Sequence, residues 1–252
     1  MVLPPGFERV HEARVTWLVR TDTRSWLAPL VRGLGTGTID GASSRLPGGR
    51  GGSRVVRVGA HDVVVRHLRR GGLPARFLHD TYCGWHPRPF RELCHTEALR
   101  AAGVPVVEVY AAVVRWLLPG CYRGWLVTRY IARAQTLWEW TATAAPADAR
   151  QAVFSAVGHA VRRLHDAGSC HPDLNLNNIL VVTADPPGKP AVVLIDFDRP
   201  AWSSWHVGTM EADLTRLRRS AHKLDPEERR VGAPDLACLE AAYRSSESEC
   251  VR

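Results

Sequence analysis

HPDLNLNN, residues 171–178, is the stretch of this sequence that decides its fold. It sets His171, Asp173 and Asn178 in the pattern H-x-D-x4-N, and the tripeptide DFD at 196–198 follows after a short apolar segment. An aspartate and an asparagine at this spacing in a loop can both turn into one cleft. Because both residue types are common in turns, neither would mean much alone. Their combination in this order indicates a catalytic site rather than an ordinary loop.

The segment after this loop has the pattern of a β-hairpin. Residues 179–182 form a short apolar run that is rich in β-branched side chains, which is typical of a buried strand. Residues 185–190, DPPGKP, are turn formers, and residues 191–195 form a second apolar run. A hairpin would bring Asp196, at its far end, back beside Asn178 at its start. Magnesium prefers such oxygen ligands, with phosphate oxygens completing its coordination.

These three polar residues have the chemical types that phosphoryl transfer uses. The reaction depends mostly on positioning and on neutralising phosphate charge, so few protein groups are needed. Asp173 is the predicted base that accepts the proton of the attacking hydroxyl, and Asn178 and Asp196 are the predicted metal ligands. The sequence therefore predicts a kinase that uses ATP and Mg²⁺.

A glycine-rich segment, LPGGRGGS at 46–53, precedes two predicted strands at 54–58 and 62–68. Glycines let backbone amides approach phosphates closely. Such a segment alone is as often a flexible linker, but its position before a hairpin favours a phosphate-binding loop. The glycines predicted to contact phosphate are Gly49, Gly51 and Gly52.

The second predicted strand ends in Arg66, where the V-A-I-K strand of a kinase carries its phosphate-contacting lysine. A guanidinium is bulkier than an ammonium group, and the ordinary alternative is an arginine that faces solvent. Glu92, in a helix predicted over residues 89–102, is the expected partner of this cation, with Glu97 as the alternative. Either glutamate could instead be a solvated residue on the helix surface.

The remaining pattern predicts an α+β, two-lobed, protein-kinase-like fold, with an N-terminal lobe over 1–130 and a C-terminal lobe over 131–252. The clearest helix covers 148–167, with Asp148 as its expected cap and Gly168 at its end. The other predicted elements are strands at 104–114 and 124–130, a hinge at 131–134, and helices at 210–224 and 234–243.

The composition limits the possible partners and the cellular location of this protein. The 252 residues carry 33 Lys plus Arg against 25 Asp plus Glu, a net charge of +8, and only two of the basic residues are lysines. This balance fits nucleic acid, an anionic membrane or an acidic substrate, although a bias toward arginine codons would explain part of it. No nucleic-acid-binding motif is present, so nucleic acid is not expected. The six cysteines form no C-x-x-C pair, and neither a signal peptide nor a membrane span is recognised, so a cytoplasmic, soluble or peripheral protein is expected.

Five strings together resemble the 3-deoxy-D-manno-octulosonic acid (Kdo) kinases of the lipopolysaccharide kinase family, from about residue 48 to 220. The strings are VRHLRRGG at 65–72, PFRE at 89–92, HDAG at 165–168, HPDLN at 171–175 and IDFDR at 195–199. The resemblance implies ATP-dependent phosphorylation of the Kdo 4-hydroxyl on a Kdo-lipid A precursor (Kdo-lipid IVA), in lipopolysaccharide inner-core biosynthesis. It implies a peripheral enzyme on the cytoplasmic face of the inner membrane, with Mg²⁺, an anionic membrane surface and no protein partner.

Departures from protein kinases argue against a protein kinase regulated by activation-loop phosphorylation and for a small-molecule or glycan kinase, and two alternatives to a Kdo kinase stay open. Pro172 replaces the arginine of H-R-D, Asp198 replaces the glycine of D-F-G, and Asn175 stands where a lysine contacts the γ-phosphate. One alternative is another small-molecule kinase, of the aminoglycoside or choline phosphotransferase type. The other is a non-catalytic glycolipid-binding pseudokinase. The residues expected to face an anionic surface are Arg69, Arg70, Arg76, Arg216, Arg218 and Arg219, with Trp85, Trp202 and Trp205.

Overall fold

The computed structural model describes residues 2–37, 43–45, 53–69, 80–183, 190–197 and 207–245, with the backbone alone at 43–45 and 207–209. The predicted phosphate-loop glycines lie outside these residues. The chain divides into two units: unit 1 contains 1–98 and 108–130, and unit 2 contains 99–107 and 131–252. Residues 99–107, which the sequence assigned to the N-terminal lobe, therefore pack within unit 2.

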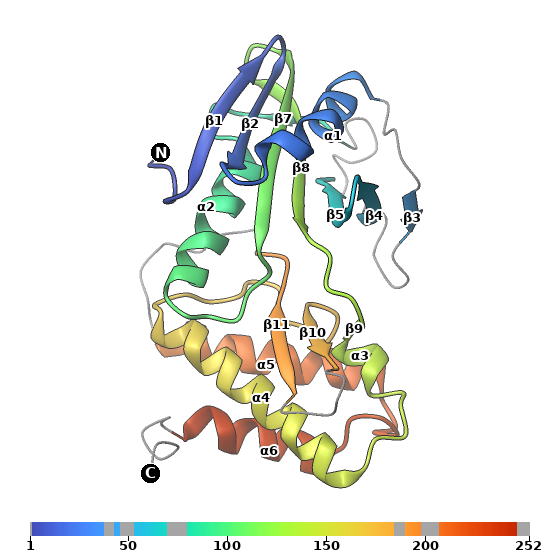
Figure 1. Cartoon of the computed structure of the whole chain (residues 1–252). Helices are drawn as coiled ribbons and strands as arrows, with labels where there is room; N and C mark the ends of the chain where they lie inside the picture. Colours follow the sequence, from blue (N-terminus) through green and yellow to red (C-terminus); the bar gives the residue numbers. More distant parts are fainter. Residues whose placement is uncertain are drawn as a thin grey trace. The chain divides into compact units, whose positions relative to one another are not determined.

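Unit 1 is built on an antiparallel sheet, whose long strands β7 and β8 are prominent in Figure 1. The strand order is β1 (Phe7–Glu12), β2 (Val15–Arg20), β7 (Val109–Leu118), β8 (Cys121–Arg129), β5 (His61–His67), β4 (Ser53–Val58) and β3 (Ser43–Arg45), and β6 (Tyr82–Cys83) also pairs with β8. The predicted hairpin of β4 and β5 is confirmed, and Gly59 adopts φ 58° in its turn, where a residue without Cβ fits best.

Helices cover both faces of this sheet, because its strands are apolar on both sides. Helix α1 (Arg24–Thr36) packs on the face that carries Trp17 and Val19 of β2. Helix α2 (Arg88–Ala101) packs on the opposite face, which carries Leu18 of the same strand. This alternation follows from the two-residue period of a strand. The sequence predicted α2, but it did not resolve β1, β2 and α1 in the mixed polar and apolar N-terminal region.

Unit 2 combines a small sheet with helices (Figure 1). Its strands run β11 (Ala191–Leu194), β10 (Ile179–Val182) and β9 (Ala134–Thr136), and its helices are α3 (Leu137–Trp140), α4 (Ala147–Asp166), α5 (Val207–Leu224) and α6 (Ala233–Arg244). The β10–β11 hairpin and the three long helices confirm the predicted elements. Gly158 lets α4 and α6 approach closely, because a Cβ there would lie 2.2 Å from the carbonyl oxygen of Leu239.

Two local predictions were wrong. Asp148 does not cap α4: the helix begins after Pro146, and Asp148 lies in its first turn. The strand predicted from residue 104 begins at Val109 instead. The backbone before it bonds to β11, with Leu194 N–H donating to Pro105 O at 2.8 Å and Val107 N–H donating to Leu194 O at 3.2 Å. The apolar run from 104 thus serves two sheets, which a periodicity pattern alone cannot separate.

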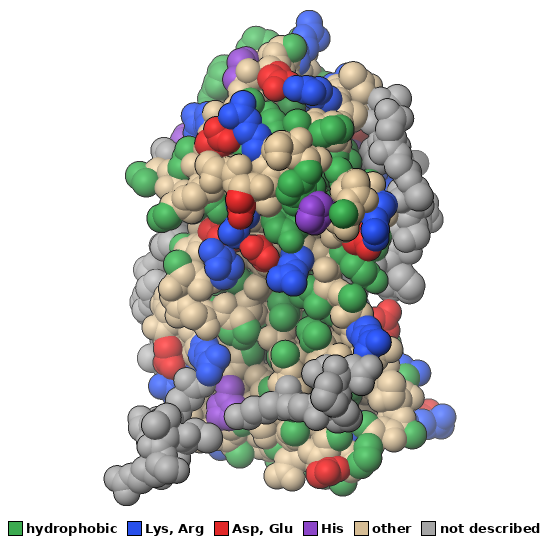
Figure 2. Space-filling model, in the orientation of Figure 1, with side chains coloured by type: hydrophobic (Ala, Val, Ile, Leu, Met, Phe, Trp, Pro, Cys, Tyr) green, Lys and Arg blue, Asp and Glu red, His purple; other side chains and the backbone are tan. Residues whose placement is uncertain are grey.

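No helix within the described part of the chain is both long and apolar enough to cross a membrane. On the face drawn in Figure 2, basic and acidic side chains are interspersed rather than segregated. No single basic patch dominates this face (Figure 2).

Candidate catalytic site

The H-x-D-x4-N segment folds into a tight loop between α4 and β10. Leu174 N–H donates to His171 O at 3.1 Å, and Asn178 N–H donates to Asn175 O at 3.0 Å. The Asn178 side-chain amide donates to the backbone oxygen of Asp173 at 2.8 Å and lies 3.4 Å from its carboxylate. These bonds hold the exposed Asp173 carboxylate beside the buried Asn178. Because the amide nitrogen of Asn178 faces Asp173, its amide oxygen is directed elsewhere and could serve a cation.

The β10–β11 hairpin closes the site as its sequence predicted. Ile179 pairs with Leu194, and Ile195 N–H donates to Asn178 O at 3.0 Å. The residue that follows, Asp196, therefore leaves the hairpin next to Asn178. The structure thus places the backbone of Asp196 next to Asn178, whose side chain contacts Asp173, all within unit 2. Hard cations such as Mg²⁺ favour carboxylate and amide oxygen donors, so the residues present fit that ion.

Asp196 adopts an unusual backbone conformation. Its φ is 69°, in the left-handed region, and it is one of four described non-glycine residues with positive φ. For a residue with a Cβ this region costs roughly 1–2 kcal/mol, although aspartate tolerates it better than most residues. Such strain persists where the surroundings fix it, often at functional sites. The strained conformation supports Asp196 as a candidate functional residue rather than one that stabilises the fold.

A buried carboxylate, Asp213 of α5, holds the start of the catalytic loop. Its Oδ2 accepts the backbone N–H of His171 at 2.7 Å and lies 3.2 Å from Nε2 of His165. Its Oδ1 accepts from Arg216 at 2.6 Å. The His171 ring in turn contacts Ile195 O through Nε2 at 2.9 Å and packs against Phe197, with ring centroids 4.7 Å apart. Asp213 thus fixes the start of the loop, and the His171 ring joins the loop to the segment that contains Asp196.

The tautomer of His165 follows from its second partner. Its Nδ1 lies 2.8 Å from the hydroxyl of Tyr243 in α6. Burial raises the pKa of Tyr243, although the positive charge of Arg162 works in the opposite direction. A phenol that stays protonated can donate to Nδ1, which leaves the Nε2–H of His165 to donate to Asp213. Asp213 thus contacts the end of α4 and the start of the catalytic loop, and Tyr243 of α6 joins the network through His165.

Sequence reasoning missed Asp213 altogether, and it assigned no role to His165. One signal was present: Asp213 stands at the spacing of Leu217 and Ala221, and all three side chains are buried on one face of α5. A carboxylate within an apolar helical stripe is costly unless it is paired. This position could therefore have been marked as a candidate, although its partners could not have been named.

In unit 1 the predicted cation and glutamate form an ion pair. Arg66 of β5 pairs with Glu92 of α2, whose side chain is 1% exposed. Glu97 instead accepts the backbone N–H of Val109 at 3.3 Å, so it supports the start of β7. The pairing thus favours Glu92 over its alternative. The neighbouring His67 stacks on a tryptophan, and burial lowers its pKa although the charge of Asp80 opposes this.

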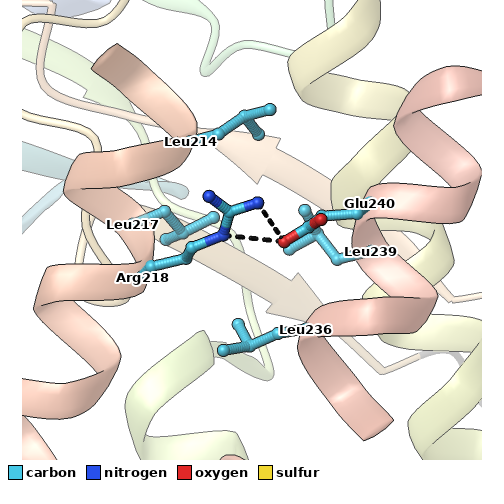
Figure 3. Close-up of a pocket in the computed structure, with 6 residues that line it drawn as sticks. All are labelled: Leu214, Leu217, Arg218, Leu236, Leu239 and Glu240. Carbon is cyan, nitrogen blue, oxygen red and sulfur yellow. Dashed lines mark hydrogen bonds and ion pairs between the residues drawn. The ribbon is translucent and has the colours of Figure 1, made fainter. Parts of the chain in front are cut away.

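A hollow between α5 and α6 lies apart from these residues. Figure 3 shows the ion pair of Arg218 and Glu240 across it, with Nε and Oε1 2.7 Å apart. Leucines complete its lining, and none of the predicted catalytic, metal-binding or nucleotide-binding residues contributes to it. Arg216 and Arg218 were expected to face an anionic surface, but both are engaged by carboxylates within unit 2. Their side chains are nevertheless 40% and 48% exposed, so their role at an anionic surface stays a prediction.

The sequence of this chain is similar to one protein family and to several of its named members. The profile of the Lipopolysaccharide kinase (Kdo/WaaP) family matches residues 40–243. The chain is 32% identical over 183 residues to a 3-deoxy-D-manno-octulosonic acid kinase of Vibrio cholerae, covering 69% of this chain and 72% of the relative. A relative of the same name from Xylella fastidiosa is 33% identical over 202 residues, covering 78% and 76%. For that of Actinobacillus succinogenes, 33% identical over 162 residues, the shares are 63% of this chain and 65% of the relative.

A solved structure described as WaaP in complex with acyl carrier protein has a similar fold. Its TM-score is 0.59 at 19% identity, and the match covers 89% of this chain and 86% of that chain. This similarity confirms the predicted α+β, protein-kinase-like fold class.

Proposed function

Because this chain belongs to the Lipopolysaccharide kinase (Kdo/WaaP) family, we propose that it phosphorylates the 4-hydroxyl of Kdo on a Kdo-lipid A precursor, with ATP as the phosphoryl donor. The relatives named as Kdo kinases support the acceptor. One observation in the structure carries the reaction type. It is the contact of Asp173 with Asn178, next to the strand that ends before Asp196.

In this proposal each of the three residues has one task. The exposed carboxylate of Asp173 accepts the proton of the Kdo hydroxyl as that oxygen attacks phosphorus. The loop hydrogen bonds orient this carboxylate, because its own backbone oxygen is held by Asn178 and by Asn175, both at 2.8 Å. The oxygens of Asn178 and Asp196 would hold Mg²⁺, which neutralises phosphate charge when bound.

The residues of unit 1 would serve the nucleotide. Glu92 is almost fully buried, whereas the Arg66 side chain is 22% exposed, so the glutamate fixes a cation that still reaches solvent. A guanidinium held in this way suits contact with phosphate oxygens. The glycines Gly49, Gly51 and Gly52 stay a proposal from sequence, because they lie outside the described residues.

We further propose peripheral attachment to the anionic cytoplasmic face of the inner membrane, where the lipid acceptor would be embedded. Arg69 and Arg219 are exposed, and Trp85 is 74% exposed. Arginines near an anionic leaflet contribute roughly 1 kcal/mol each, and tryptophan favours the membrane interface. Binding to vesicles should rise with anionic lipid content and fall with added salt.

The direct test is incubation of purified protein with Mg-ATP and Kdo-lipid IVA, followed by mass spectrometry for one added phosphate. Asp173→Asn is the matched control, since it keeps the shape of the side chain and removes the base. An aminoglycoside and choline are run in parallel as acceptors. Phosphorylation of either in place of the Kdo lipid would favour the other class of small-molecule kinase. Thermal stabilisation by Mg-ATP without any transfer would favour a pseudokinase.

The same assay tests whether a protein partner affects the reaction. The sequence implied none, whereas the solved neighbour of similar fold is a complex with acyl carrier protein. The reaction is therefore compared with and without added acyl carrier protein. Equal rates would support the expectation that this chain works alone.

A further inference from the structure

Two cysteines of unit 1 face each other across a pair of strands. Cys83 of β6 is the register partner of Cys121 of β8, and their sulfur atoms lie 3.0 Å apart. Gly84 N–H donates to Gly120 O at 2.7 Å in the adjacent pair. Because hydrogen-bonded and non-hydrogen-bonded pairs alternate in an antiparallel ladder, the cysteines occupy a non-hydrogen-bonded pair. Opposed Cα atoms in such a pair are about 4.5 Å apart, within the range that a disulfide spans.

Exposure distinguishes this pair from the other described cysteines. Cys83 is exposed and Cys121 is half-buried, whereas Cys170 is 3% exposed. Burial raises the pKa of Cys94, which lowers the thiolate fraction of that residue. Cys83 is thus the described thiol most open to a soluble oxidant, with a second thiol already in contact with it.

We propose that Cys83 and Cys121 form a reversible disulfide when the chain meets a low-molecular-weight disulfide such as glutathione disulfide. The exposed Cys83 thiolate attacks one sulfur of glutathione disulfide, which forms a mixed disulfide and expels one glutathione thiolate. The Cys121 thiolate then attacks Cys83 Sγ and expels the second glutathione. The protein loses two protons and two electrons, and the oxidant becomes two glutathione thiols.

The disulfide would reinforce the attachment of the short strand β6, and of the helix α2 that follows it, to β8. Strand β6 has only two residues, yet it leads directly to the start of α2. That start is tied to the same strands, because Arg88 N–H donates to the hydroxyl of Tyr122 at 2.9 Å and the Arg88 side chain donates to that of Tyr82 at 3.1 Å. A covalent bond between β6 and β8 closes a loop that contains all of α2 with Glu92. The thiol state therefore controls how firmly this helix is anchored, whatever reaction the protein catalyses.

The experiment uses the full chain in glutathione buffers of increasing oxidising strength, with alkylation of remaining thiols and proteolysis without reductant. The expected product is a peptide joining residues 83 and 121, lighter by two hydrogens, that disappears on reduction. It should be absent from Cys83→Ser and from Cys121→Ser. It should persist in Cys238→Ser, a control whose half-buried sulfur lies 3.1 Å from Ser155 Oγ.

Oxidation should also raise the melting temperature of the wild type by roughly 5 °C or more, as expected for closing a loop of this length, and should leave both single variants unchanged. Full alkylation of both cysteines after oxidation would overturn the proposal. So would linkage of either to another cysteine, including Cys250, which lies outside the described residues.

Discussion

Replacing Asp213 with alanine should destabilise unit 2 and disturb the catalytic loop together. The side chain is fully buried and accepts hydrogen bonds from His171 and Arg216, with His165 beside it. Alanine leaves the backbone N–H of His171 and the ring of His165 without this acceptor. A buried donor left unsatisfied costs about 1–3 kcal/mol, so the two together should cost roughly 3–5 kcal/mol.

Asparagine at position 213 should be milder, and the structure gives the reason. Its single amide oxygen can still accept from His171, while its NH₂ group turns toward Arg216. Arg216 is 40% exposed and can move into water, so the loss is mainly one charge-assisted hydrogen bond of about 1.5–3 kcal/mol. The expected order of stability is wild type, then Asp213→Asn, then Asp213→Ala.

Urea unfolding followed by far-ultraviolet circular dichroism measures these differences. Asp166→Ala is the matched control, because it removes a 58% exposed carboxylate that pairs with Arg162 on the surface of α4. Its cost should stay below about 0.5 kcal/mol. In the kinase assay, Asp213→Asn should lower kcat by up to about 10²-fold with little change in secondary structure, since small displacements of catalytic groups are costly. An Asp213→Ala protein within about 1 kcal/mol of wild type would refute this reasoning.

Three further outcomes are expected. Asp196→Asn should raise the Mg²⁺ concentration for half-maximal rate more than Asn178→Ala does, because it removes a full charge; an unchanged value would remove Asp196 from the metal site. Gly158→Ala should lower the free energy of unfolding by about 1–3 kcal/mol, because the new Cβ meets the α6 backbone, and an unchanged urea midpoint would contradict that close approach. Burial tends to raise the pKa of Asp225, but backbone N–H groups of 229–231 and the charge of Arg230 outweigh it and lower the pKa. Its stabilising effect should be complete above the unfolded pKa, about 4, and lost as pH falls through the lower folded pKa, so Asp225→Asn and wild type should converge in acid; a constant difference would argue against it.

The sequence alone predicted the parts of this protein that depend on local pattern. The apolar spacing of α4 and the two short apolar runs around a turn predicted a helix and a hairpin, and both are present. The loop with Asp173 and Asn178 could be recognised for the same reason, because the residues that form it are neighbours in the chain. The hairpin then fixes the position of Asp196 next to Asn178 without any distant contact.

Tertiary structure decided which distant groups meet. Asp213 reaches His171 from 42 residues away, and no pattern in either segment names the other. The Arg66 side chain pairs with Glu92, while Glu97, on the same helix, bonds to the start of β7. The physical reason is the same in each case. A buried charge must find a partner, but which partner lies within reach depends on how helices and strands pack, and that is set by the whole core rather than by the residues nearby.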